Sequence, residues 1–180
     1  IFMNLVSKID EQVRTAIDQC AATGYEALIL SFGSHCNMED TSAANIKKWR
    51  GLADYAHSKK VFIGSYSLFS SRKISDEDDV ISPKTGKPGG AFFGNAPCFG
   101  SKWGLAYRDK IKNFYAHTGF DIWENDGPYP GDVCVSTTHP GHKGLEDSQW
   151  KQMEIQKDLY RSLNGKGVYI NAPHWYFVDV

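Results

Sequence analysis

The chain has 180 residues, of which 41% are hydrophobic, 13% aromatic and 23% charged. This composition excludes a disordered segment, a collagen-like repeat and a small disulfide-rich domain. The 20 basic and 21 acidic residues give a net charge of -1, so the positive footprint of a nucleic-acid-binding domain is absent. The length fits one domain with a sizeable hydrophobic core.

The sequence has no apolar stretch of membrane-spanning length, and its start lacks the basic-then-apolar pattern of a signal peptide. We therefore expect neither a membrane nor a nucleic acid as a partner. Because the chain opens at Ile1 rather than Met, it is either a processed protein or a piece of a longer one. The cysteines are widely spaced without a CxxC pair, and they predict neither a disulfide framework nor a cysteine zinc site. They are Cys20, Cys36, Cys98 and Cys134.

The first half of the chain alternates helical and strand patterns. Ser7 can cap a helix over 7–23, in which apolar residues recur at helical spacing. The continuous apolar run at 27–30 predicts a strand that is buried on both faces. A second helix over about 42–59 and a second strand over 61–66 follow.

Two long loops rich in Gly and Pro interrupt the second half, at 67–101 and 127–145. Loops of this length in a compact domain are usually functional or mobile. The acidic run 76–79 in the first loop is expected to face solvent. The other predicted elements are, in chain order, a helix at 103–117, a strand at 120–124, a helix at 146–163 and a strand at 168–171.

Strands that alternate with helices predict a parallel sheet with right-handed crossovers. Both long loops follow strands, so we expect them at the active-site face of such a sheet. Residues 31–35, after the first strand, form neither a dinucleotide fingerprint nor a phosphate-binding loop. The predicted fold class is therefore α/β, a partial TIM (β/α)8 barrel. Since a complete barrel needs about 250 residues and eight strand–helix units, residues 1–180 are expected to form part of one barrel domain.

Asp126 is the strongest catalytic candidate, because it lies between an apolar strand and a Gly-Pro turn, where a buried charge is costly. A carboxylate at the end of a barrel strand can act as nucleophile, base or metal ligand. It can equally do no more than cap the turn. Aromatic residues near the same strand ends, among them Trp123, Tyr129 and Trp175, suit the stacking of sugar rings.

His139 and His142 could join His35 or His174 at a metal ion. Their spacing is common by chance, and histidines in loops are more often plain polar residues. We therefore expect no metal and no other cofactor.

Three segments, residues 52–67, 119–126 and 24–30, resemble the alpha-galactosidases and their clan of retaining alpha-glycosidases. Residues 52–67 (LADYAHSKKVFIGSYS) resemble the stretch of those enzymes that leads from the second helix into the third strand. Residues 119–126 (GFDIWEND) are similar to the strand whose last aspartate is their nucleophile, and they also fit the corresponding pattern of the related alpha-glucosidases. Residues 24–30 lie where the clan has a further strand motif, and the three matches together cover about residues 10–130.

The resemblance implies barrel strands two to five, with the first strand before Ile1. It also implies a retaining glycosidase similar to alpha-galactosidases or alpha-N-acetylgalactosaminidases, which cleaves a terminal alpha-linked sugar with Asp126 as nucleophile. The acid/base carboxyl would follow strand six, beyond Val180. The implied partner is an oligo- or polysaccharide, and secreted or periplasmic enzymes are typical of the clan. The residues expected to line the sugar subsite are Trp123, Glu124, Asn171, His174, Trp175 and His35.

Two departures from the family leave the specificity open. Ser31 and Phe32 replace an Asp-Asp pair that grips galactose hydroxyls, and Glu124 replaces a sugar-binding lysine. A modified galactoside, an N-acetylhexosamine or another linkage is equally compatible. The alternatives are a carbohydrate-binding relative without activity and a metal-dependent barrel hydrolase. The latter would use His35, His139, His142 and Asp126.

Part of a barrel exposes unpaired strand edges and apolar faces, which favour aggregation. The 180-residue segment is therefore expected to be neither stable nor active by itself.

Overall fold

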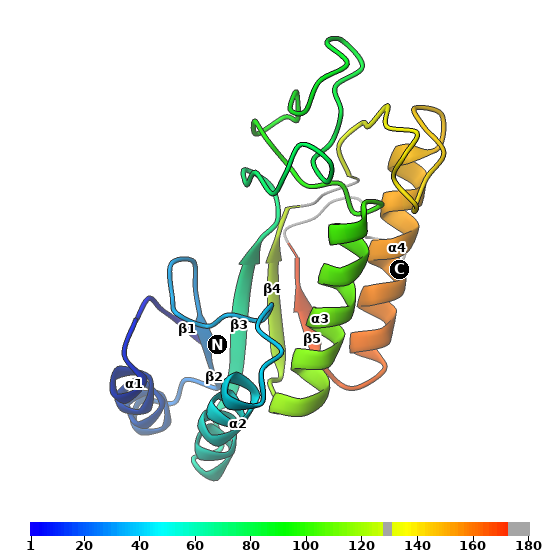
Figure 1. The fold of residues 1–180 in the computed structure, drawn as a ribbon. Helices are drawn as coiled ribbons and strands as arrows, with labels where there is room; N and C mark the ends of the chain where they lie inside the picture. Colours follow the sequence, from blue (N-terminus) through cyan, green and yellow to red (C-terminus); the bar gives the residue numbers. More distant parts are fainter. Residues whose placement is uncertain (128–130, 173–180) are drawn as a thin grey trace. The chain divides into compact units, whose positions relative to one another are not determined.

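The computed structural model describes residues 1–127 and 131–172. Over these residues, parallel strands and helices alternate along the chain (Figure 1). The elements are β1 Phe2–Leu5, α1 Asp10–Thr23, β2 Ala27–Leu30, α2 Ala43–Ser58, β3 Phe62–Leu68, α3 Lys102–Thr118, β4 Ile122–Asp126, α4 Ser148–Asn164 and β5 Tyr169–Asn171. None of the helices in the described part of the chain has the length and apolar character to cross a membrane.

The strands form one sheet in the order β1-β2-β3-β4-β5, which follows the chain without reversal. The pairs β1–β2, β2–β3 and β4–β5 are parallel. Right-handed crossovers that always step in one direction place all helices on the same face of the sheet. This is the arrangement of a (β/α) barrel, whereas a doubly wound sheet reverses its order. The predicted fold class, part of a TIM barrel, is confirmed.

The strand that the sequence analysis expected before Ile1 is β1 itself. Phe2 pairs with Ala27 and Leu5 with Leu30, so β1 lies parallel to β2 at the edge of the sheet. The described chain therefore contributes five strands rather than four. The strand was missed because Asn4 interrupts its apolar residues, and because its four residues alternate between exposed and half-buried positions.

The first helix begins at Asp10, three residues after the predicted start. Its N-cap position is Ile9, whose backbone is extended and which provides no side-chain cap. The hydroxyl of Ser7 instead accepts a hydrogen bond from the Ile9 N–H at 3.0 Å and donates one to Gln12 Oε1 at 2.7 Å. Ser7 therefore stabilises the turn that leads into the helix and does not cap it.

The two faces of the sheet differ in what covers them. On the outer face, Ser65 of β3 and Trp123 of β4 contact Tyr115 of α3, with the Ser65 Oγ 2.7 Å from the tyrosine hydroxyl. On the inner face, Ala27, Ile29 and Ile122 form a small apolar cluster. Side chains alternate between these faces along each strand.

Gly64 lets β3 and β4 approach closely on the inner face. A Cβ atom at this position would lie 2.8 Å from Ile122 Cβ and 3.2 Å from Ile29 Cγ1. Further toward the amino ends of the strands the inner face is open, because Phe2, Phe62 and Tyr169 are 46%, 56% and 64% exposed. A closed barrel fills its interior with such side chains, and part of a barrel leaves them exposed.

The chain divides into two compact units. The first unit contains the body of the sheet and consists of Ile1–Ser67, Lys110–Asn125 and Leu163–Asn171. The second unit consists mainly of Leu68–Asp109 and Asp126–Ser162, and thus holds both long loops.

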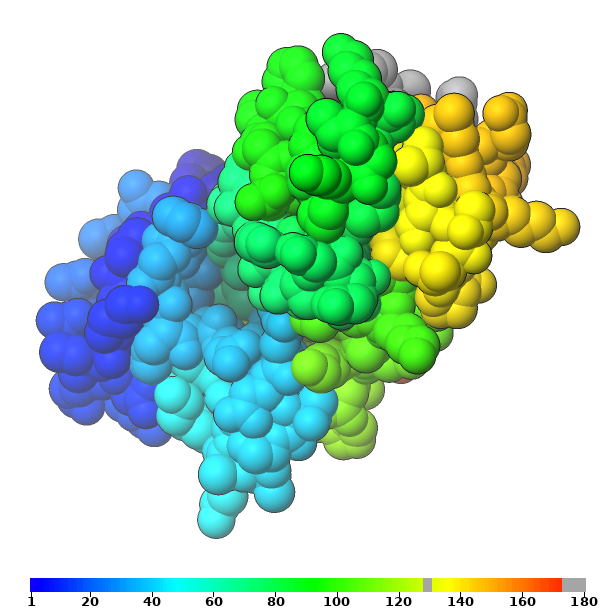
Figure 2. Space-filling model, turned by 45° about the horizontal axis from the view of Figure 1, so that its top comes forward, coloured from blue at the N-terminus to red at the C-terminus, as the bar shows by residue number. Residues whose placement is uncertain are grey.

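The two long loops pack against each other within the second unit. Figure 2 shows the first loop (green) and the second loop (yellow) as adjoining masses of atoms, and the Val135 N–H donates to the Ile81 carbonyl at 3.0 Å. Val80, Cys98 and Cys134 form a small buried core between them.

The acidic run of the first loop does not simply face solvent, as the sequence analysis expected. Asp79 is fully buried, and its Oδ1 accepts from the Ile74 N–H at 2.9 Å. Asp78 Oδ1 accepts from the Trp103 N–H at 3.0 Å, so that it caps the start of α3. Asp78 and Asp79 can lie inside the loop structure because each accepts a hydrogen bond from a backbone N–H group.

Candidate functional site

Two carboxylates lie at the carboxyl end of β4, the end at which active sites of (β/α) barrels form. Glu124 and Asp126 follow Ile122 at alternate positions, so they share its inner face. Both are half-buried, and Asp126 is the last residue of the strand, as predicted. Residues two apart in a strand are separated by about 7 Å. The strand therefore presents two acidic groups to the interior of the barrel.

Glu124 meets Asn171 across the sheet. The two residues are direct partners in the β4–β5 register, and the Asn171 Nδ2 donates to the Glu124 Oε1 at 3.4 Å. The fold thus brings together two residues that the sequence analysis placed in the sugar subsite.

Trp123 takes the opposite face of β4. Its side chain is fully buried, and Nε1 donates to the Ser67 Oγ at 2.9 Å. The same hydroxyl donates to the Asn125 Oδ1 at 2.9 Å. Because odd-numbered positions of β4 face the helices, Trp123 has no exposed ring face on which a sugar could stack. This placement differs from the expected one.

His35 is held at the start of α1. Its Nδ1 lies 2.8 Å from the Ser7 carbonyl oxygen and its Nε2 lies 2.6 Å from the Asp10 Oδ1. The two contacts together fix the orientation of the ring. His35 therefore ties the loop after β2 to α1. The remaining predicted subsite residues, His174 and Trp175, and the aromatic candidate Tyr129 lie outside the described residues.

Two residues from the segments that resemble alpha-galactosidases meet at the amino end of the sheet. Asp121 precedes β4, and its Oδ2 accepts from the Ile63 N–H and pairs with the His57 Nε2, each at 2.9 Å. This carboxylate connects the end of α2 to β3 and β4. In a (β/α) barrel this end supports stability and the opposite end carries the chemistry. The motif therefore combines a structural aspartate with Asp126.

An aromatic pair at the carboxyl ends of β2 and β3 was not predicted. Phe32 is 62% exposed, and its ring lies 5.8 Å from that of Tyr66 in an edge-to-face arrangement. Tyr66 follows Gly64 by two positions and so points to the inner face. In the sequence, Phe32 drew attention only as the loss of an acidic residue, although its aromatic character was the signal that could have identified the pair.

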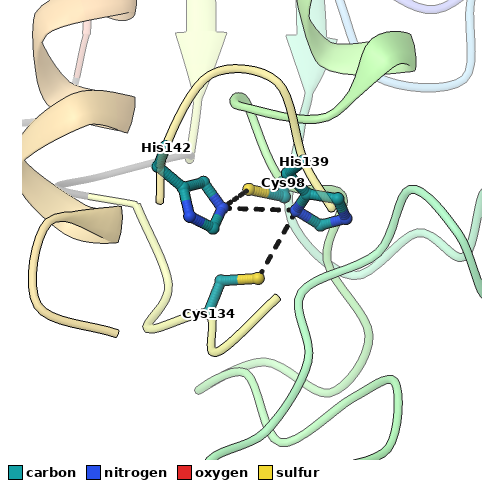
Figure 3. Close-up of side chains that lie close together, drawn as sticks. All are labelled: Cys98, Cys134, His139 and His142. Atoms are coloured by element: carbon teal, nitrogen blue, oxygen red, sulfur yellow. Dashed lines mark hydrogen bonds between the residues drawn. The ribbon is translucent and has the colours of Figure 1, made fainter. Parts of the chain in front are cut away.

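Four ligand-type side chains converge in the second unit: Cys98, Cys134, His139 and His142 (Figure 3). All four are buried, and their donor atoms lie within 4.8 Å of one another. His139 and His142 therefore join two cysteines, and neither ring nitrogen of His35 is free to complete a site with them. The signal that could have revealed this cluster is the short spacing Cys134-x4-His139-x2-His142.

The cysteines of this cluster affect each other's ionisation. A hydrogen bond between the two thiols lowers the pKa of Cys134 and raises that of Cys98, and burial raises both. Burial lowers the pKa of His139, but its hydrogen bond to Cys134 and the charge there outweigh burial and raise it. The thiolate character is thus concentrated on Cys134, beside an imidazole.

Comparison with known proteins finds similarity in structure but not in sequence. No protein-family model matches the chain, and no curated protein does. Among solved structures, an alpha-N-acetylgalactosaminidase from Bifidobacterium bifidum aligns with 96% of this chain at a TM-score of 0.62 and 14% identity. A GH36 alpha-galactosidase from Geobacillus stearothermophilus, solved with raffinose, aligns with 96% of it at a TM-score of 0.65 and 12% identity.

The chain has the fold of part of these glycosidases. It spans 34% of the bifidobacterial enzyme and 27% of the Geobacillus enzyme. The resemblance to alpha-galactosidases and alpha-N-acetylgalactosaminidases, inferred from three short segments, is confirmed at the level of the fold.

Proposed function

We propose that this chain is part of a glycoside hydrolase that removes a terminal alpha-linked sugar with retention of configuration, and that Asp126 is its nucleophile. The observation that carries the proposal is the position of Asp126, the last residue of β4 and on its inner face, in a fold shared with alpha-galactosidases and alpha-N-acetylgalactosaminidases. Nucleophiles of barrel enzymes occupy such strand ends.

In the proposed mechanism the Asp126 carboxylate attacks the anomeric carbon and forms a covalent glycosyl-enzyme. A second carboxyl group protonates the departing oxygen and then removes a proton from the water that hydrolyses the intermediate. Retaining enzymes hold the two groups about 5–5.5 Å apart. We place the second carboxyl in the remainder of the barrel, outside these 180 residues. This placement agrees with the comparison, in which the chain spans only 34% of the bifidobacterial enzyme.

The proposed sugar subsite includes Glu124 and Asn171 as hydrogen-bonding residues and Phe32 with Tyr66 as an aromatic surface. The carboxylate of Glu124 accepts hydrogen bonds from sugar hydroxyls, and the amide of Asn171 can both donate and accept. An exposed ring such as that of Phe32 suits the CH face of a pyranose. Because Glu124 is an acceptor where alpha-galactosidases have a cationic donor, we expect a sugar other than plain galactose.

The same replacements motivate the alternative of a carbohydrate-binding relative without hydrolytic activity. Two carboxylates two residues apart on β4 repel each other when both are ionised. A lysine at position 124 would not repel Asp126 in this way. The metal-dependent hydrolase is not favoured, because His139 and His142 face Cys98 and Cys134.

The test uses the full-length protein and a panel of aryl alpha-glycosides that includes galactose, N-acetylgalactosamine and glucose. A fluorosugar inhibitor that traps the glycosyl-enzyme should add its mass to the peptide that contains Asp126. Asp126→Ala should lower kcat by at least about a thousandfold, and added azide should restore turnover as a glycosyl azide. Asp109→Ala, an exposed carboxylate of α3, is the matched control and should retain activity.

An adduct on another residue, or activity that survives Asp126→Ala, would reject Asp126 as nucleophile. Binding of a sugar with no turnover of any glycoside would favour the non-hydrolytic alternative.

A further inference from the structure

We propose that Cys98, Cys134, His139 and His142 form a structural zinc centre that joins the two long loops of the second unit. Cys98 comes from the segment between β3 and α3, and the other three come from the segment between β4 and α4. The proposed ion would therefore connect two loops that follow neighbouring strands. This proposal is independent of the proposed glycosidase activity.

Three of the six distances between the donor atoms match those of tetrahedral zinc. Zn–N bonds of 2.0–2.1 Å and Zn–S bonds of about 2.3 Å place two nitrogens about 3.3 Å apart and a nitrogen and a sulfur about 3.6 Å apart. The His139 Nδ1 and His142 Nε2 are 3.3 Å apart. The Cys98 Sγ lies 3.3 Å from the His142 Nε2, and the Cys134 Sγ lies 3.5 Å from the His139 Nδ1. The other three pairs of donor atoms lie within 4.8 Å of each other, so all four atoms surround a space in which one ion could bind.

A hydrogen bond outside the cluster sets the tautomer of one ligand. The His139 Nε2 lies 2.9 Å from the Glu77 carbonyl oxygen, so Nε2 carries the proton and the Nδ1 lone pair faces the cluster. Metal-bound histidines usually donate their second ring N–H to such a partner. When the His142 Nε2 binds the ion, the proton of that ring lies on Nδ1, which is buried without a partner among the described residues.

Backbone N–H groups surround the two sulfur atoms. The Ile81 N–H donates to the Cys134 Sγ at 3.3 Å, and the Cys98 sulfur accepts hydrogen bonds from Gly100 and Ser101. Hydrogen bonds of this kind stabilise a thiolate over a thiol. Such N–H groups around both sulfurs are compatible with a metal bound through two thiolates.

Two glycines permit the loops to cross beside the cluster. The Gly141 N–H donates to the Gly100 carbonyl at 2.7 Å. A Cβ atom at Gly100 would lie 2.6 Å from the His142 Cδ2, and one at Gly141 would lie 2.5 Å from the Gly100 Cα. The close approach brings Cys98 to the histidines and leaves no room for a side chain at either crossing position.

The ligand set identifies the metal and its role. Two thiolates and two imidazoles suit zinc, whereas calcium and magnesium require oxygen ligands. Four protein donors fill a tetrahedral sphere and leave no position for a reactive water, which is typical of structural centres. Binding forms two Zn–S and two Zn–N bonds and releases the two thiol protons to solvent, without a change of oxidation state.

The experiment measures zinc in the full-length protein, purified without a metal-affinity tag. Elemental analysis and native mass spectrometry should both find one zinc per chain. After removal of the metal, thiol labelling followed by peptide mass spectrometry should find free thiols at Cys98 and Cys134. Cobalt substitution should give the visible absorption bands of a tetrahedral S2N2 site. Cys134→Ser and His142→Gln should each weaken zinc affinity, which is measured against a competing chelator. The loss should exceed the roughly 10–100-fold that is typical when a residue hydrogen-bonded to a metal ligand is removed.

The control variants Cys36→Ser and His117→Gln remove a cysteine and a histidine from the first unit, away from the proposed centre in the second unit. Both variants should retain one zinc per chain. Hydrogen exchange should become faster in the described parts of both loops, 68–101 and 131–145, when a chelator removes the ion. A protein that neither contains nor takes up zinc overturns the proposal, as does a disulfide between Cys98 and Cys134. Retention of zinc at full affinity by the Cys134 and His142 variants also overturns it. None of these readouts depends on hydrolytic activity.

Discussion

Replacing Asp121 by alanine tests whether the two aspartates of the segment 119–126 have separate tasks. Asp121 lies before β4 and pairs with the Ile63 N–H and His57, whereas Asp126 ends the strand. If the amino end of the sheet supports stability and the carboxyl end carries the chemistry, Asp121→Ala should lower the free energy of unfolding. It should leave catalysis per folded molecule nearly unchanged.

The cost follows from the two contacts that the substitution removes. Ile63 is fully buried, and its N–H would lose an acceptor at 2.9 Å, which costs about 1–3 kcal/mol. The pair with His57 is partly exposed on both sides and contributes about 0.2–1 kcal/mol. Together these give about 1–4 kcal/mol. In a domain of 150–250 residues, 1 kcal/mol corresponds to roughly 2–4 °C in Tm, and the shift is smaller in a larger domain.

The measurement is chemical denaturation of the full-length protein, with His57→Ala and the double variant completing a cycle. His57→Ala removes only the exposed pair and should cost less than about 1 kcal/mol. Asp121→Asn keeps an oxygen that can accept from Ile63 and should fall between wild type and Asp121→Ala. Asp109→Ala serves as the control for loss of a surface carboxylate.

Two results would refute this reasoning. The first is an Asp121→Ala protein with unchanged stability, or with no greater loss than His57→Ala. The second is a loss of kcat in Asp121→Ala, at equal folded fraction, as large as that of Asp126→Ala.

Three further substitutions test how acidic side chains support the fold. Burial raises the pKa of Asp10, but the hydrogen bond from His35 and nearby positive charge outweigh burial and lower it. Its stabilising contribution is therefore present above the unfolded pKa of about 3.9 and is lost as the pH falls through the lower folded value. Asp10→Asn should lower stability by roughly 0.2–1 kcal/mol at neutral pH, and the difference should vanish in acid denaturation curves. Asp78→Ala removes the acceptor of the Trp103 N–H at the start of α3 and should cost about 0.5–2 kcal/mol in denaturant unfolding. Burial raises the pKa of Asp132 in the folded state, so the fold loses stability as the pH rises through this raised pKa and the carboxyl ionises. Asp132→Asn should therefore raise Tm at neutral pH but not in acid. An equal effect of Asp10→Asn at all pH values, an unchanged Asp78→Ala protein, or a lower Tm for Asp132→Asn would contradict these assignments.

Much of the fold could be predicted because its signals are local. The run Ala27–Leu30 is buried at every position, as its continuous apolar character indicates. The position of Asp126 at a strand end followed from the apolar residues before it and the turn after it. The strand Phe2–Leu5 was missed because its pairing with β2 stabilises it, and its own four residues carry no distinctive pattern.

By itself, the sequence determined the alternation of strands and helices, the part-barrel fold class and the presence of two long loops that follow strands. These features depend on periodicity and on residues close together along the chain. Tertiary structure decided which polar residues meet. It placed Trp123 against the helices, because strand positions alternate between faces, and it brought Phe32 beside Tyr66. It also joined Cys98 to Cys134, 36 positions later in the sequence. That contact exists because the two loops cross at Gly100 and Gly141, where the absence of side chains allows backbone to touch backbone.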